Sequence, residues 1–137
     1  MTYNEVLKEA MSLTESEQKE LVKALRFDYS REERIRVQIL ECKGFVADYT
    51  AKMGQALGVD PKMIFSRKRN RILVNIRWVI WHDLWHRDYS TTVIARSCGY
   101  HHSIIRRGVT SVDDVRKNPA YDPELWKVVE AFDKANQ

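Results

Sequence analysis

Cysteine, glycine and proline are scarce in this chain of 137 residues. Its two cysteines, Cys42 and Cys98, are too few for a disulfide framework or a cysteine-rich zinc module. Only five glycines and three prolines interrupt the chain, and we find neither a strand-like alternation nor an internal repeat. We therefore predict an all-α fold made of several helices.

Long apolar runs and nucleotide-binding motifs are also missing. No run approaches the ~18 apolar residues of a membrane span, and residues 1–10 lack the apolar core of a secretory signal. The pattern G-x-x-x-x-G-K-[ST] of P-loop ATPases does not occur. We expect a soluble cytoplasmic protein that binds no cofactor and has no membrane partner. Its 44% of apolar residues suffice for one compact domain.

Charge is distributed unevenly, although the net value is only +4. Residues 62–110 contain ten Lys and Arg but only two acidic residues, Asp83 and Asp88, which gives this segment a net charge of +8. The flanking segments, residues 1–61 and 111–137, each have a net charge of −2. A charge run is often no more than a solvated surface. Confinement of the whole excess to one third of the chain instead favours an anionic partner.

Helix starts are marked clearly in the first half of the chain. Residues 2–5 (TYNE), 14–17 (TESE) and 30–33 (SREE) each fit the capping box, in which a Ser or Thr accepts from a helical amide and a Glu reaches back. Two short helices are therefore expected in an N-terminal arm, residues 1–29, which could pack as a pair or dimerise. A longer helix should follow and end at Gly58. Its apolar stripe consists of Ile35, Ile39, Cys42, Val46, Tyr49, Met53 and Leu57.

Two Asp-Pro pairs mark further helix starts. Asp60 before Pro61 predicts a short helical turn. Asp122 before Pro123 predicts a last helix over residues 122–132. In both pairs the acid can cap the helix, and the proline has no amide to lose at the first helical position.

A helix predicted over residues 71–87 carries WHDLWH (81–86), which places His82 and His86 four residues apart. Zinc peptidases need such a pair together with a third ligand, an open coordination position and a carboxylate base. Asp83 stands where that base would be, but it is one methylene shorter than Glu. The candidates for a third ligand are Cys98, His101 and His102. Without a second supporting motif, we interpret this segment as a packing helix with Asn75 and both histidines on its polar face, and we predict neither a metal site nor an enzyme.

The segment STTVIARSCGYHHSIIRR (90–107) predicts two short helices joined at Gly99. Ser90 caps the first, and a left-handed glycine lets the two cross steeply, which is the layout of a helix-turn-helix. The second helix of that motif enters the major groove, where the residues expected to read base edges are His101, His102 and Ser103. Arg106 and Arg107, one turn later, are expected to contact phosphates. The alternative is an ordinary helical hairpin inside a bundle.

Four stretches occur in the order found in a known family: ALGVDPKMIFSRKRNR, ILVNIRWVIWHDL, STTVIA and GYHHSII. Through them, residues 44–116 resemble the C-terminal DNA-binding domain of the bacterial replication initiator DnaA, which has a Trp-repressor-like helix-turn-helix. The resemblance covers about half of the chain. It implies a bacterial or phage protein that binds double-stranded DNA in transcription or in a process related to replication initiation. Initiation itself is not implied, because the ATPase motif is absent.

The resemblance assigns roles to individual residues. It places Arg77 on the family's arginine that enters the minor groove. The basic loop that helps this arginine comprises Arg67, Lys68, Arg69 and Arg71. His102 and Ser103 fall on the family's base-reading His and Thr, and Thr91 and Thr92 fall where the first helix of the motif meets phosphate.

Arg77 also stands out without the resemblance, because it projects into the apolar arc of its helix, where an unpaired charge would be costly. A guanidinium that reaches past the loop into a narrow minor groove would explain it, and an internal ion pair is the alternative. The chain departs from the family at His101, where the family has Asp, at Ile104, where it has Thr, and at Ala95, where it has Gly. The turn is also one residue shorter. The bases that are read can therefore differ, while backbone contacts persist.

These observations predict three segments: the arm of residues 1–29, a DnaA-like helix-turn-helix domain of residues 30–117, and residues 118–137, a helix packed on that domain. The predicted function is sequence-specific binding of double-stranded DNA, with a homodimer or a protein partner held through the N-terminal helices. The first alternative is a protein-interaction module built on a DnaA-like domain. The least favoured alternative is a zinc-dependent hydrolase that uses His82 and His86.

Overall fold

The structure is a computed structural model that describes residues 14–137. Every regular element in that range is a helix and none is a strand, so the predicted all-α fold is confirmed. None of these helices is both long and apolar enough to cross a membrane. The chain divides into two compact units, Met1–Val37 and Gln38–Gln137. The capping box predicted at residues 2–5 lies outside the described residues.

The first described helix, α2 (Glu15–Leu57), has no break. Thr14 starts it as predicted, because its Oγ1 accepts a hydrogen bond of 3.2 Å from the amide of Glu17. The helix start predicted at residues 30–33 is wrong. Residues 15–43 contain no glycine or proline that would end a helix. The helix therefore continues through residues 30–33, and the capping sequence there does not start a new one.

Five further α-helices and one 3₁₀ helix are described in the second unit. They are α3 (Pro61–Ile64), α4 (Arg71–His86), α5 (Thr91–Cys98), α6 (His102–Lys117), η1 (Pro119–Tyr121) and α7 (Pro123–Ala135). Gly58 and Gly99 follow α2 and α5 with left-handed φ values of 67° and 75°, as predicted. Asp60, Ser90 and Asp122 cap the next helices, each accepting from a backbone amide at 3.0, 3.2 and 3.1 Å respectively.

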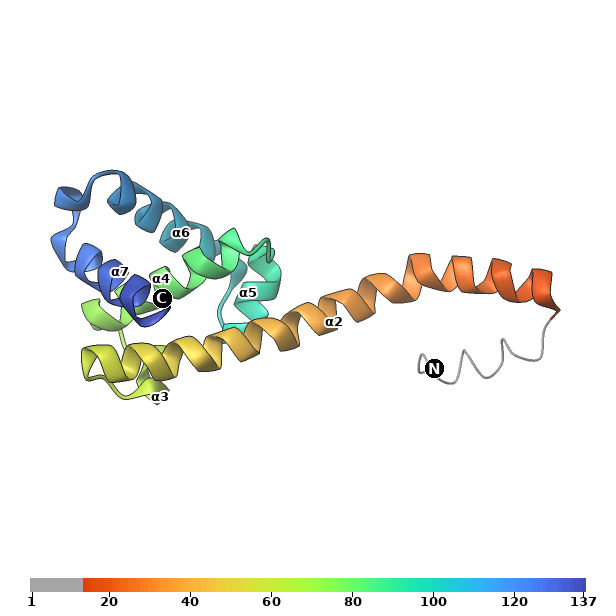
Figure 1. Cartoon of the computed structure of the whole chain (residues 1–137), viewed down its shortest axis with the longest axis horizontal. Coiled ribbons are helices and arrows are strands. Elements are labelled where there is room, and N and C mark those ends of the chain that lie inside the picture. Colours follow the sequence, from red (N-terminus) through yellow and green to blue (C-terminus); the bar gives the residue numbers. More distant parts are fainter. Residues whose placement is uncertain (1–13) are drawn as a thin grey trace. The chain divides into compact units, whose positions relative to one another are not determined.

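Helix α4 lies at the centre of the second unit, where α3, α5, α6 and α7 all pack against it (Figure 1). Its predicted apolar arc is buried, with Ile76, Ile80 and Leu84 fully enclosed. Asn75 and His82, which were predicted on a polar surface, are only 2% and 7% exposed, so that expectation is wrong. A helix covered on several sides has no broad arc facing solvent.

The part of α2 that belongs to the second unit closes another side of this core. Cys42, Tyr49 and Met53 of its predicted stripe are buried. The Tyr49 ring meets Phe132 of α7 edge to face, with ring centroids 4.9 Å apart. Residues 118–137 therefore pack into the same core as α2 and α4.

Candidate nucleic-acid interface

In the structure the basic loop spans residues 65–70, because Arg71 is already the first residue of α4, and one buried arginine holds this loop in place. Arg77 lies on α4 and is only 5% exposed. Its guanidinium donates to the carbonyls of Ile64, Ser66 and Lys68, and Nη2 lies 2.7 Å from each of the last two. Burial lowers the pKa of Arg77, yet an arginine keeps its charge, and its rigid fork of donors suits several carbonyls at once. Arg77 therefore fixes the conformation of the loop.

This arrangement corrects the role expected for Arg77. The residue occupies the apolar arc as predicted, but its donors face the backbone of the loop instead of reaching past it. The alternative of an internal ion pair is also wrong within residues 14–137, where its hydrogen-bond partners are carbonyl groups. The basic side chains that remain exposed on the loop are Arg67, Lys68 and Arg69.

Tyr100 ties the same loop to the turn between α5 and α6. Its hydroxyl donates to the Ser66 carbonyl at 2.6 Å. Arg67 donates from Nη2 to the Gly99 carbonyl at 3.2 Å, and its guanidinium carbon lies 5.1 Å from the centre of the Tyr100 ring. The loop and the turn are therefore joined by contacts in both directions and form one continuous surface.

The first turn of α6 exposes the residues predicted to read bases. His101 caps the helix, because its Nδ1 accepts from the Ser103 amide at 3.2 Å, and this leaves Nε2 for another partner. His102 and Ser103 are also exposed. Of the two isoleucines that could have faced the core, Ile105 is fully buried and Ile104 is 40% exposed. The start of α6 therefore presents polar side chains and one apolar side chain to solvent.

A hollow of about 470 Å³ lies between the loop and α6. Arg67 and Arg69 line it from the loop, and Arg107 lines it from α6. Trp78 and Ile104 add apolar surface, and no acidic residue is among the lining residues in the described part of the chain. A concave surface lined by charges of one sign focuses their field, so this hollow attracts anions.

Arg71 differs from its neighbours in the basic segment. Its Nη2 lies 2.9 Å from Asp122 Oδ2, and its Nε lies 3.2 Å from Glu124 Oε2, both at the start of α7. These two carboxylates match its charge and connect α4 to α7. Arg71 therefore contributes less to the attraction of an anion than its place in SRKRNR predicts.

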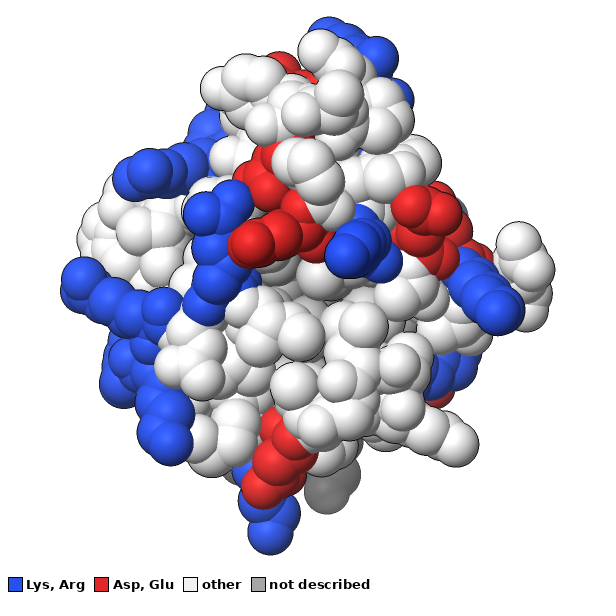
Figure 2. Space-filling model, turned by 90° about the vertical axis from the view of Figure 1, so that its left-hand side faces the viewer, with Lys and Arg blue, Asp and Glu red and all other residues white. Residues whose placement is uncertain are grey.

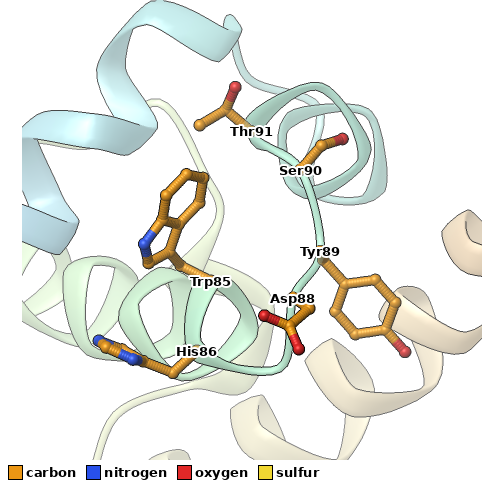
Figure 3. Close-up of a pocket in the computed structure, with 6 residues that line it drawn as sticks. All are labelled: Trp85, His86, Asp88, Tyr89, Ser90 and Thr91. Carbon is orange, nitrogen blue, oxygen red and sulfur yellow. The ribbon is translucent and has the colours of Figure 1, made fainter.

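A second hollow, of about 480 Å³, lies at the start of α5. Trp85 and Thr91 both line it, while the imidazole of His86 points away from Thr91 (Figure 3). The Arg106 guanidinium carbon lies 5.0 Å from the centre of the Trp85 ring and brings a positive charge close by. Thr92 is exposed and Thr91 half-buried, a placement that allows the predicted phosphate contacts beside the first amides of α5. Asp88 lines the same hollow and adds a negative charge to it.

On the face of the molecule shown in Figure 2, several Lys and Arg side chains lie along the left side with no Asp or Glu side chain among them. Over the rest of this face, acidic and basic side chains lie next to one another. A surface edge with such an excess of positive charge can attract a polyanion.

His82 and His86 form a polar cluster with Asp113, which belongs to α6. Asp113 Oδ1 lies 2.7 Å from His82 Nε2 and 3.4 Å from His86 Nε2. The residue that joins the histidine pair is therefore an aspartate from the far part of α6. The three residues predicted as candidates for this position were Cys98, His101 and His102, and that prediction is wrong.

Burial and hydrogen bonding set the ionisation of this cluster. Burial lowers the pKa of His82, and the opposing influence of Asp113 is smaller. Burial alone would raise the pKa of Asp113, but hydrogen bonds from His82 and His86 hold it below its usual range. A neutral imidazole therefore faces a carboxylate at neutral pH. Burial also raises the pKa of Cys98 to about 12, so its thiol stays protonated.

Tyr100 and Asp113 contribute to these sites although the sequence pattern gave neither of them a role. The position of Tyr100, beside the left-handed Gly99 and among basic residues, is a local signal that could have pointed to it. The meeting of Asp113 with α4 depends on how α6 crosses that helix, which no local pattern contains.

No protein-family model matches the chain, and neither a curated protein nor a solved structure matches it significantly. The resemblance to the DnaA domain stays a prediction.

Proposed function

We propose that the unit of residues 38–137 binds double-stranded DNA in a sequence-dependent manner, as a DnaA-like regulator of transcription or replication. The observation that carries the proposal is the hollow between the basic loop and α6. There Arg67, Arg69 and Arg107 converge from two elements with no acidic residue between them. An array of unmatched guanidinium groups on one surface is the electrostatic footprint that a phosphate backbone requires.

The start of α6 supplies the readout in this proposal. His102 and Ser103 are exposed at the N-terminal end of the second helix of a helix-turn-helix, the part that meets base edges in the major groove. Imidazole and hydroxyl groups can both donate and accept, so they can distinguish base pairs there. Ile104, which is 40% exposed, can contact a thymine methyl group.

The loop follows the backbone beside α6, and its exposed cations enter the adjacent minor groove. Arg67, Lys68 and Arg69 take the role that the resemblance gives to Arg77, while Arg77 keeps the loop in shape beneath them. Because the loop backbone is fixed before DNA arrives, little ordering entropy is lost on binding. The exposed start of α5 offers Thr91 and Thr92 to another phosphate.

Binding to a labelled random duplex of about 30 base pairs, followed by fluorescence anisotropy from ~50 to ~300 mM salt, tests the proposal. If roughly six phosphates are neutralised, the logarithm of the association constant falls with the logarithm of salt concentration with a slope near −5. Replacement of Arg67, Arg69 and Arg107 together by Gln should make that slope shallower by about 3.

The matched control replaces two arginines that are already paired, through Arg71→Gln and Arg116→Gln. Arg71 contacts Asp122 and Glu124, and Arg116 contacts Asp133, so this variant should keep most of the affinity. Failure of the wild-type chain to bind duplex at the lowest salt would reject DNA binding and favour the protein-interaction module. An equal loss in the control variant would show that the hollow is not the binding surface. Selection from random duplexes then identifies the preferred sequence.

A further inference from the structure

A compact group of metal-ligand atoms lies between α4 and α6, and one of its residues, His86, also lines the hollow at the start of α5. His82 and His86 project one helical turn apart on α4, and Asp113 faces them from α6. One potential ligand atom from each of these three side chains lies within 4.8 Å of the others. The two imidazole nitrogens point at the same carboxylate oxygen, at 2.7 and 3.4 Å.

We propose that His82, His86 and Asp113 form a binding site for a divalent transition-metal ion, with zinc as the ion that fits best. Two imidazoles and one carboxylate are ligands that zinc and its first-row neighbours accept, whereas magnesium and calcium prefer oxygen ligands alone. Zinc–ligand bonds of about 2.0–2.2 Å in tetrahedral geometry place ligand atoms about 3.3 Å apart. The separation of 3.4 Å between His86 Nε2 and Asp113 Oδ1 is close to this value, and the 2.7 Å contact of His82 must open by roughly half an ångström.

Hydrogen bonding satisfies only part of this cluster. The contact between His82 and Asp113 is a good hydrogen bond, and it explains why a buried imidazole is tolerated there. The His86 nitrogen, at 3.4 Å, is too far from the same oxygen for a strong bond. A metal ion placed among the three groups would satisfy both nitrogens and the carboxylate at once.

The neighbouring charged groups leave the site available to a cation. Asp83, the acid inside WHDLWH, accepts from the Tyr49 hydroxyl and from Arg87 Nε at 2.9 Å, so it belongs to another network. Arg116 lies one turn beyond Asp113, but it donates two hydrogen bonds to Asp133, at 2.8 and 3.1 Å. Asp133 therefore offsets its charge, although the guanidinium is among the groups that lower the pKa of His82.

Access and ligand number define the kind of site. The side chains of His86 and Asp113 are 57% and 42% exposed, so an ion can enter from solvent and keep one or more waters. The ion would bridge α4 to α6, the helix whose other end carries His102 and Ser103. Because the three ligands meet only in the folded unit, zinc should stabilise the folded state and hold α6 against α4.

The test is titration of the full chain, without a histidine tag and after treatment with a chelator, with zinc chloride by isothermal calorimetry. We expect one ion per chain with a dissociation constant in the micromolar range or lower. Thermal melts with a ~100-fold excess of free zinc over that constant should show a midpoint raised by at least about 5 °C. Magnesium chloride at the same concentration should leave the midpoint unchanged.

Two variants separate this site from the other histidine pair of the chain. His86→Ala removes an exposed ligand and should fold normally by circular dichroism, yet weaken zinc binding at least tenfold. The control replaces His101 and His102 by Ala, because their ring centroids are 4.4 Å apart and an adjacent surface pair can bind zinc by itself. Absence of zinc binding by the wild-type chain, unchanged affinity in His86→Ala, loss of binding in the control, or an equal response to magnesium would each overturn the proposal. None of these measurements involves DNA, so they stand apart from the test of DNA binding.

Discussion

Arginines in two regions of the second unit have opposite surroundings. Around the hollow between the basic loop and α6, Arg67, Arg69 and Arg107 face no acidic lining residue. Along the contacts with α7, Arg71 and Arg116 are paired with carboxylates at 2.9 and 2.8 Å. Both regions are rich in arginine, but only the first can attract a polyanion without breaking an ion pair.

This difference shows what a charge count misses. Residues 62–110 have a net charge of +8, and the sequence treats each cation in that segment alike. In the structure, Arg71 forms ion pairs with carboxylates at the start of α7, and Arg77 donates hydrogen bonds to carbonyls of the loop. The charge available to a ligand is therefore smaller than the total, and it is concentrated on the loop and on the first turns of α6.

The largest expected effect belongs to Arg77, because this arginine lines the same hollow and its guanidinium holds the loop that carries Arg67 and Arg69. Arg77→Met leaves the carbonyls of Ile64 and Lys68 without the guanidinium donor and the Ser66 carbonyl with the Tyr100 hydroxyl as its remaining donor. Hydrogen bonds to a charged group are worth about 1.5–3 kcal/mol each, and loop relaxation recovers part of them. We expect the free energy of unfolding to fall by about 3 kcal/mol in urea denaturation.

Arg77→Lys is the control for this prediction. A single ammonium group cannot reach three carbonyls in the geometry of a guanidinium, so it should restore only part of the stability. If Arg77→Met instead unfolds like the wild-type chain but loses affinity for DNA, Arg77 contacts the duplex directly, and the supporting role assigned to it is wrong.

Local signals in the sequence predicted most helix ends correctly. Gly58 and Gly99 adopt left-handed backbone conformations, and Asp60, Ser90 and Asp122 accept from the amides that they were expected to cap. These features depend on two to four neighbouring residues, so a short sequence window contains them. The false start at residues 30–33 shows the limit of such a window: a capping sequence begins a helix only where the chain is not already helical.

The candidate sites were predictable only in part, because they join residues from different elements. The position of His101, His102 and Ser103 at the start of a helix was predicted correctly, since a helix-turn-helix has a local pattern, while their role in reading bases stays a prediction. Three features of these sites depend on how neighbouring helices enclose α4. They are the burial of His82, the hydrogen bonds from Arg77 to carbonyls of the loop, and the contact between His82 and Asp113. Packing of this kind is set by the whole fold, and the spacing of residues along one helix does not reveal it.

Gly108 allows a test of how closely α6 packs against α4, because it lies at the contact of these two helices next to the hollow. A Cβ added at this position would lie 2.5 Å from Trp78 Cδ1 and 3.0 Å from Trp81 Cε3. Overpacking costs about 1–3 kcal/mol, which exceeds the gain of about 1 kcal/mol that alanine brings to a helix. We expect Gly108→Ala to lower the free energy of unfolding by about 1–2 kcal/mol in urea denaturation.

Gly44→Ala provides the matched control within α2. A Cβ added there meets no atom within 4 Å, so only the gain in helix propensity remains, and the variant should be stabilised by about 1 kcal/mol. Equal stabilisation by both substitutions would show that α6 does not approach the tryptophans as closely as described.

Base readout should produce a smaller and more selective change than the loss of Arg77. His102→Ala and Ser103→Ala remove exposed side chains, so stability should stay within about 0.5 kcal/mol of the wild-type value. Affinity for the selected sequence should fall by about 1.5 kcal/mol, while affinity for random duplex changes little. Competition between the two duplexes measures the ratio. A uniform loss on both would mean that these side chains contact the backbone and do not read bases.

The smallest expected effect concerns the paired region. Arg116 lies on α6 and Asp133 on α7, and their side chains are 35% and 46% exposed. Solvent screens an ion pair of this exposure, so Arg116→Ala should lower the free energy of unfolding by only about 0.5 kcal/mol, and by less at high salt. Asp133→Ala should have a similar effect, and the double variant should show that the two losses do not add. Because this arginine is matched in the free protein, DNA affinity should be unchanged in Arg116→Ala and should rise slightly in Asp133→Ala, which frees a positive charge. A clear loss of affinity in Arg116→Ala would mean that the duplex also lies across α7. The unmatched arginines at the hollow and the paired arginines along α7 would then not differ in DNA binding.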